Sequence, residues 1–168
     1  MSLAFSIDRG AGSLHLGAAI RIERKCPLPL IEPQVAGLIR RQRDFGNGYA
    51  WHDLEGLSFG AAPAWLSLCF HHAHLTEASW SVDPPGSSPA ADWPTRAETD
   101  REIAFVREVL AQQIGYDPAQ PAGRYAWGEV WSSYDPKADL AGHGLRYHPQ
   151  NAPGKRGLGA MVMAFLRR

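Results

Sequence analysis

The amino-acid sequence predicts a single α+β domain, in which an antiparallel, meander-like sheet of about six strands carries two main α-helices on one face. Short runs of alternating apolar and polar residues follow one another between Gly- and Pro-rich turns, as in an antiparallel sheet. Two segments, residues 33–43 and 95–115, have apolar residues at helical spacing, and they do not alternate with strands as βαβ units would. Since 168 residues, 45% of them hydrophobic, suffice for one buried core, we expect residues 1–168 to form one domain.

The N-terminal part of the chain predicts a hairpin, a connector and a helix. Residues 3–22 contain short apolar runs on either side of DRGAGS, whose glycines and small polar residues suit a turn between two strands. The prolines of KCPLPLIEP predict an extended connector. Pro33 then fits the first turn of a helix that runs to about Arg43, and the cations of RRQR suit the C-terminal end of that helix.

Residues 49–82 predict an antiparallel meander. Asn-Gly in the preceding FGNGYAW suits a turn, and the following segments alternate as strands do. The histidine-rich sequence FHHAHL indicates a polar hairpin turn at His72 and Ala73, which would place His71 opposite His74. The residues expected to supply the buried face are Trp51, Leu57, Phe59, Leu66, Leu68, Phe70, Trp80 and Val82.

The clearest predicted element is the helix at 95–115. Thr95 and Glu98 have the spacing of a capping box, and Gly115 suits the position just past a helix end. The segment before it, residues 83–94, is rich in Pro, Ser and Ala and predicts a surface loop.

The C-terminal third predicts two further strands. RYAWGEVWSSY indicates a strand with Tyr125, Trp127 and Trp131 on one face, and DPKADLAGHG indicates a turn before a strand that starts at LRYH. Residues 149–157 are expected to form a loop. The last segment, 158–168, is apolar on all sides, so its pattern fits a central strand and a buried helix equally well.

The charge balance, the cysteines and the glycines of the sequence exclude several classes of partner. The 17 basic and 17 acidic residues give no net charge, which argues against nucleic acid as the partner. Cys26 and Cys69 have no CxxC-like spacing, and no apolar run is long enough to cross a bilayer, so we expect a cytoplasmic protein without a membrane partner. The glycine-containing segments GKRG and DRGAG lack the context of a phosphate-binding loop, and no cofactor is expected.

Two alternatives remain open at the level of sequence. A small hydrolase or metal-dependent enzyme would use the histidine-rich hairpin and the 135–148 loop. Its candidate metal ligands are His71, His74, His143 and His148. Because their spacing matches no ligand motif and Ser132 is not on a GxSxG elbow, we assign no catalytic residue and favour a non-enzymatic protein. The other alternative is a small-molecule-binding domain.

The leading hypothesis is a protein-binding module, a monomer or homodimer whose partner is another protein. Six Trp and five Tyr are more aromatic side chains than one sheet face can bury, and Trp, Tyr and Arg are enriched at interface hot spots. The predicted interface residues are Trp93, Tyr125, Trp127, Trp131, Tyr134 and Arg146. The layout of a small domain with an aromatic sheet and no catalytic signature resembles bacterial toxin-neutralising and adaptor proteins. This resemblance implies an immunity or inhibitor protein that binds its partner.

Overall fold

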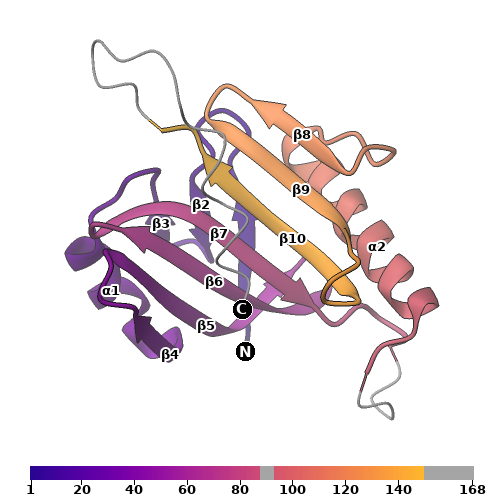
Figure 1. The fold of residues 1–168 in the computed structure, drawn as a ribbon, viewed down its shortest axis with the longest axis horizontal. Coiled ribbons are helices and arrows are strands. Elements are labelled where there is room, and N and C mark those ends of the chain that lie inside the picture. Colours follow the sequence, from indigo (N-terminus) through magenta and orange to yellow (C-terminus); the bar gives the residue numbers. More distant parts are fainter. Residues whose placement is uncertain (88–92, 150–168) are drawn as a thin grey trace.

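One mixed sheet of ten strands organises the part of the chain that the computed structural model describes, residues 1–87 and 93–149 (Figure 1). The elements in chain order are β1 (Leu3–Ile7), β2 (Leu14–Leu16), β3 (Ile20–Ile22), α1 (Leu28–Val35), a 3₁₀ turn (Ala36–Leu38), β4 (Ile39–Asp44), β5 (Tyr49–Phe59), β6 (Ala62–His71), β7 (His74–Val82), α2 (Arg96–Ile114), β8 (Ala122–Tyr125), β9 (Gly128–Asp135) and β10 (Leu140–Tyr147). The strand order is β3-β2-β1-β5-β6-β7-β10-β9-β8, and β4 pairs with β5 beside this path.

The expected fold class is therefore wrong. The described chain is a mostly-β domain with two α-helices, and its sheet is mixed because β1 runs parallel to β5. The predicted α+β domain had about six antiparallel strands. The strands that the prediction missed are β3 and β8, which are only three or four residues long, and β4, which lacks an apolar alternation. The predicted hairpin at 3–22 is confirmed, because β1 pairs antiparallel with β2 across DRGAGS. Residues 158–168, most of the 149–157 loop and residues 88–92 of the 83–94 loop lie outside the described residues.

β5 pairs with two different strands along one of its edges. Its first half pairs with β4, and its last residues, Leu57–Phe59, pair in parallel with β1. The register of β5 against β6 shifts between Leu54 and Leu57, where Gly56 has a φ of +77° that an L side chain rarely adopts. This irregularity bends the strand, so one strand can join the N-terminal strands to the meander.

The predicted helix at 33–43 is also wrong. α1 spans Leu28–Val35, with Pro29 in its first turn and Pro33 inside it, and the chain then turns into strand β4. Arginines from RRQR pair across the sheet instead of capping a helix: Arg41 Nε lies 2.9 Å and Arg43 Nη2 3.0 Å from carboxylate oxygens of Asp53. Burial alone would raise the pKa of Asp53, but hydrogen bonds from Ser67 and Arg41 and the charge of Arg43 lower it overall.

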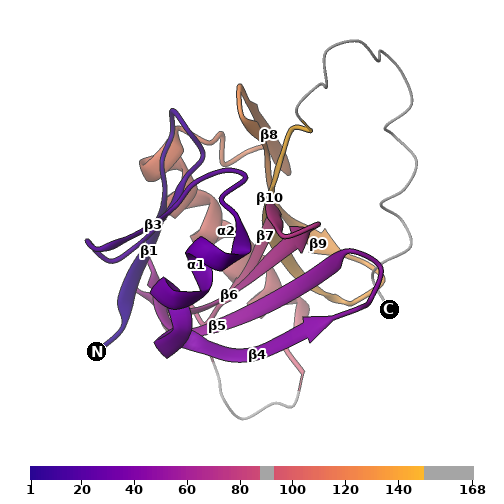
Figure 2. The same cartoon turned by 90° about the vertical axis from the view of Figure 1, so that its left-hand side faces the viewer.

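The predicted helix at 95–115 is confirmed as α2. The Thr95 hydroxyl accepts a hydrogen bond from the Glu98 N–H at 3.2 Å, the Glu98 carboxylate accepts one from the Thr95 N–H at 2.6 Å, and Gly115 is left-handed with a φ of 68°. α2 packs on β9, β10 and β1, and Figure 2 shows α1 and α2 on the same side of the sheet. The described residues contain no helix that is long and apolar enough to cross a membrane.

The predicted meander at 49–82 is confirmed as β5, β6 and β7, and its alternation separates two faces. In β6, Leu66, Leu68 and Phe70 point into the core under the helices and are fully buried. All the residues expected on this buried face lie there except Trp51. Trp51 is half-buried and lies on the opposite face, because it pairs with Cys69 and not with a core residue of β6.

RYAWGEVWSSY is a hairpin and not the single strand that its pattern indicated. β8 ends at Tyr125, β9 begins at Gly128, and the two strands pair in antiparallel register across a turn at Ala126 and Trp127. Trp127 therefore leaves the strand and packs into the core, 3% exposed, where its indole N–H donates to the Arg9 carbonyl at 2.9 Å. The expected alignment of Tyr125, Trp127 and Trp131 on one face is lost.

Candidate binding groove

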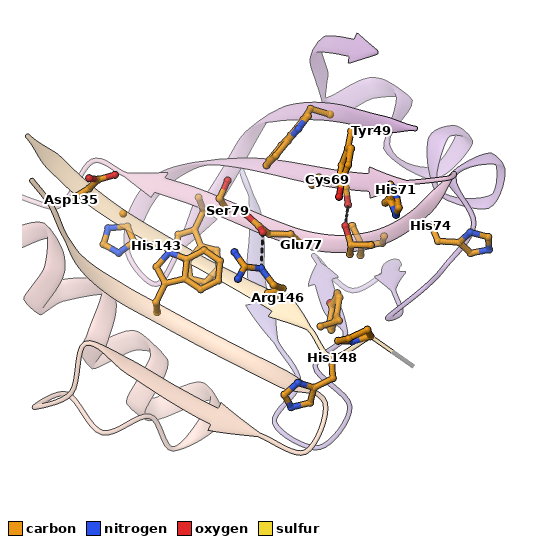
Figure 3. A pocket seen from close by; sticks show the side chains of 18 of the residues that line it. Tyr49, Cys69, His71, His74, Glu77, Ser79, Asp135, His143, Arg146 and His148 are labelled. Atoms are coloured by element: carbon orange, nitrogen blue, oxygen red, sulfur yellow. Dashed lines mark hydrogen bonds and ion pairs between the residues drawn. The ribbon is translucent and has the colours of Figure 1, made fainter. Parts of the chain in front are cut away.

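An open groove of about 800 Å³ lies on the face of the sheet that α1 and α2 leave uncovered (Figure 3). Its lining comes from neighbouring strands, because the pleat turns every second residue of a strand toward the same side. The strands contribute Tyr49 and Trp51 (β5), Cys69 and His71 (β6), Glu77 and Ser79 (β7), Gly142 and Arg146 (β10), and Trp131 and Asp135 (β9). In register, Trp51 pairs with Cys69. The row continues from Cys69 to Glu77 and from Glu77 to Arg146.

Tryptophan side chains stand at both ends of this row, Trp51 on β5 and Trp131 on β9. Trp131 lies over β10 at its register partner Gly144, where an added Cβ atom would be 2.2 Å from Trp131 Cζ2. The missing side chain of Gly144 thus lets the indole approach the floor of the groove. The guanidinium carbon of Arg146 is 5.4 Å from the centre of the Trp131 ring, and that of Arg43 is 5.9 Å from Trp51. Both tryptophans therefore have fixed neighbours before any occupant arrives.

The charges at the centre of the groove are paired. Arg146 Nε donates to Glu77 Oε2 at 3.0 Å, and its Nη1 donates to Glu129 Oε1 at 3.4 Å (Figure 3 shows the first contact). Glu77 keeps 14% of its side chain exposed and Arg146 37%, so this half-exposed network contributes little to stability. Most of the exposed surface of the groove is nevertheless apolar. An apolar or aromatic occupant suits such a surface better than a highly charged one.

The histidine-rich segment forms the tip of the β6–β7 hairpin, and the predicted turn is confirmed. His72 and Ala73 have φ angles of 48° and 62°, and His71 pairs with His74 across the turn. The rings of Tyr49 and His71 stack in the groove with centroids 4.4 Å apart, and the ring of His72 is tilted against that of His71 at 4.2 Å. His74 turns away, and its Nδ1 lies 2.8 Å from the carbonyl of His72.

All four candidate metal ligands border the groove, but their ring nitrogens have different partners and do not converge on one point. His71 and His74 lie at the hairpin tip, His148 Nε2 lies 3.2 Å from the Tyr125 carbonyl, and the ring of His143 faces the core. Among residues 1–87 and 93–149, no three His, Cys, Asp or Glu side chains are grouped so that they could hold a metal ion.

A serine, a histidine and a glutamate do form a hydrogen-bonded chain, but it is sealed inside the domain. His143 Nδ1 lies 2.9 Å from Ser132 Oγ, and His143 Nε2 lies 3.1 Å from Glu102 Oε1. The carboxylate can only accept, so in a neutral imidazole Nε2 carries the ring proton and Nδ1 accepts from the serine hydroxyl. These contacts resemble those of a hydrolase triad. Ser132 is 0% exposed, however, so no substrate reaches its oxygen, and the chain instead ties α2 to β9 and β10.

Of the predicted interface residues, Trp131 and Arg146 share the groove. Tyr125 stacks on buried Trp127 outside it, with ring centroids 5.0 Å apart. The guanidinium carbon of Arg96 lies 4.0 Å from the centre of the Tyr134 ring. Trp93 is 55% exposed and lies just before α2. These two also lie outside the groove.

Tyr49, Trp51 and Glu77 line the groove but were not among the predicted interface residues. The sequence carries one signal for them: Trp51 and Cys69 fall on strands of known alternation, and counting residues from buried Leu54 and Leu68 places them on the open face. The shift of register between Leu54 and Leu57 hides that signal, because it breaks the count within β5.

Cys69 on the groove floor offers a test of this geometry. Burial, with the nearby charge of Glu77, raises the pKa of the Cys69 thiol to about 11. About one thiol in a thousand is then ionised at pH 8, and only the thiolate reacts. In the Cys26→Ser variant we expect iodoacetamide to modify Cys69 very slowly at pH 8, with a rate that rises about tenfold per pH unit up to pH 10. A rate at pH 8 equal to that of the unfolded protein would contradict the burial of Cys69.

Comparisons with known proteins add one weak likeness. No protein-family model and no curated protein sequence matches this chain. One solved structure, "Rhs1-CT in complex with cognate immunity protein RhsI1", has a chain that is similar to it with a TM-score of 0.47 and 15% sequence identity, over 85% of this chain and 86% of that chain.

Proposed function

We propose that this protein is a binding protein of the immunity or inhibitor type, which neutralises a partner protein by holding part of it in the groove. The carrying observation is the open groove of about 800 Å³ with Trp51 and Trp131 on its walls and Arg146 at its centre. Trp, Tyr and Arg in the middle of a binding surface supply most of the binding energy at protein interfaces.

The exposure of the tryptophans supports this proposal. Burial of all six would have left no aromatic surface for a partner. The structure instead buries Trp80 and Trp127, half-buries Trp51 and Trp131 in the groove, and leaves Trp65 and Trp93 40% and 55% exposed. Large apolar side chains kept at a concave surface favour a binding function over a purely structural one.

The same groove supports a small-molecule-binding domain as the second candidate, because its volume falls within the range of small-molecule sites. The proposal includes a cytoplasmic location, which the two free cysteines favour.

The test is affinity capture from a lysate of the source organism with the full chain and two variants. Trp131→Ala removes a groove wall, and we expect it to weaken partner binding by about 2 kcal/mol, roughly 30-fold. Trp65→Ala is the matched control, since Trp65 is exposed but does not line the groove, and we expect affinity within about twofold of the unmodified chain.

The identified partner is then titrated against each protein by calorimetry. A partner that binds all three proteins equally well would place the binding surface outside the groove and end the proposal. A chain that captures no protein but is stabilised against heat by a metabolite, and loses this response in Trp131→Ala, would favour the small-molecule candidate.

A further inference from the structure

We infer that residues 158–166 of this chain, LGAMVMAFL, bind in the groove while the partner is absent and compete with the partner for it. This inference rests on the proposed function, because it names a second occupant for the partner site. No side chain in this segment is charged, and its two methionines and one phenylalanine are large and apolar. Such a run is unfavourable in water and needs an apolar surface to cover it.

The chain passes the edge of the groove just before this segment. β10 ends at Tyr147, and the next two residues, His148 and Pro149, line the groove (Figure 3 labels His148). Eight residues, 150–157, separate Pro149 from Leu158 and can span up to about 26 Å. β10 and β5 are three strand spacings apart, about 14 Å, so the segment can reach the far wall at Trp51.

The chemistry of the two surfaces matches. Methionine side chains adapt to irregular apolar surfaces, and their sulfur atoms make favourable contacts with aromatic rings such as Trp51 and Trp131. Glu77 and Arg146 already satisfy each other, so an uncharged occupant leaves this central ion pair intact. The covalent tether raises the local concentration of the segment to the order of millimolar, so even a weak contact keeps the groove occupied.

Competition has a consequence for the partner. If the segment fills the groove for most of the time, the apparent affinity for the partner equals the intrinsic affinity multiplied by the fraction of molecules whose groove is free. The segment would thus protect the aromatic walls from unspecific contacts, and only a partner with sufficient affinity would displace it.

The experiment compares two full-chain variants with the same added charge. The double substitution Met163→Asp, Phe165→Asp weakens the binding of the segment to the groove. The double substitution Asn151→Asp, Ala152→Asp adds the same charge to the residues before the segment. We expect the fluorescence of added anilinonaphthalene sulfonate to rise severalfold in the first variant and to stay at the unmodified level in the second. A synthetic peptide of residues 155–168 should displace this dye, and adding Trp131→Ala to the first variant should lower the signal. Circular dichroism verifies that each variant is folded.

Equal dye binding by the two variants, or a peptide that does not displace the dye, would overturn the inference. The proposed function has its own readout, since partner capture depends on Trp131 whether or not the segment occupies the groove. Once the partner is known, the Met163→Asp, Phe165→Asp variant should bind it about tenfold more tightly. Unchanged affinity in that variant would also count against competition.

Discussion

Replacing His143 by alanine is expected to lower the free energy of unfolding by about 3 to 5 kcal/mol. The substitution leaves the fully buried Ser132 hydroxyl and the largely buried Glu102 carboxylate without the imidazole that joins them. It also opens a cavity beside Trp80, whose ring is stacked on that of His143 with the ring centroids 6.4 Å apart. Because Glu102 belongs to α2, the change loosens the helix from the sheet.

Urea unfolding followed by circular dichroism measures this effect. Ser132→Ala should cost less, about 1 to 3 kcal/mol, because it leaves only Nδ1 unsatisfied. The double variant should cost less than the sum of the two single ones, since both remove the same hydrogen bond. His148→Ala is the control on the same segment, exposed and expected to change stability by less than about 0.5 kcal/mol. If His143→Ala cost no more than this control, the buried chain would not be what holds α2 to the sheet.

Gly128→Ala is expected to destabilise the protein by about 3 kcal/mol, at the upper end of the cost of overpacking. A Cβ atom at Gly128 would lie 2.1 Å from the carbonyl oxygen of Arg146 and 3.0 Å from the Tyr147 Cα. These are backbone atoms of β10, the strand that pairs with β9, and they cannot move without breaking the pairing at this end of the groove.

Gly142→Ala provides the matched comparison in the same strand pair. Its nearest atom would be the Ser133 carbonyl oxygen at 3.8 Å, an ordinary contact. Since glycine weakens a strand interior, we expect a change within about 0.5 kcal/mol and in the stabilising direction. The measurement is the melting temperature of both variants in thermal unfolding. Similar melting temperatures for Gly128→Ala and Gly142→Ala would show that β9 and β10 do not approach each other as described.

Elements with complete local signals were predictable from the sequence. α2 carries its own start in Thr95 and Glu98 and its own stop in Gly115, and both caps form as predicted. The His72–Ala73 turn follows from the alternation on either side of it. Trp131 and Arg146 were selected for the interface because of their residue types, and both line the groove.

Local sequence patterns suffice to predict most of one buried face, the long helix and the hairpin order of β5 to β7, because each of these depends on residues close together in the chain. That RRQR forms β4 depends on tertiary contacts, since the carboxylate of Asp53 that pairs with Arg41 and Arg43 lies on a different strand. The parallel pairing of β1 with β5 and the meeting of Glu102 with His143 join residues roughly forty or more positions apart, which no local pattern encodes. The groove has the same origin. It exists because both helices pack on one face of the sheet and leave the aromatic residues of the other face open.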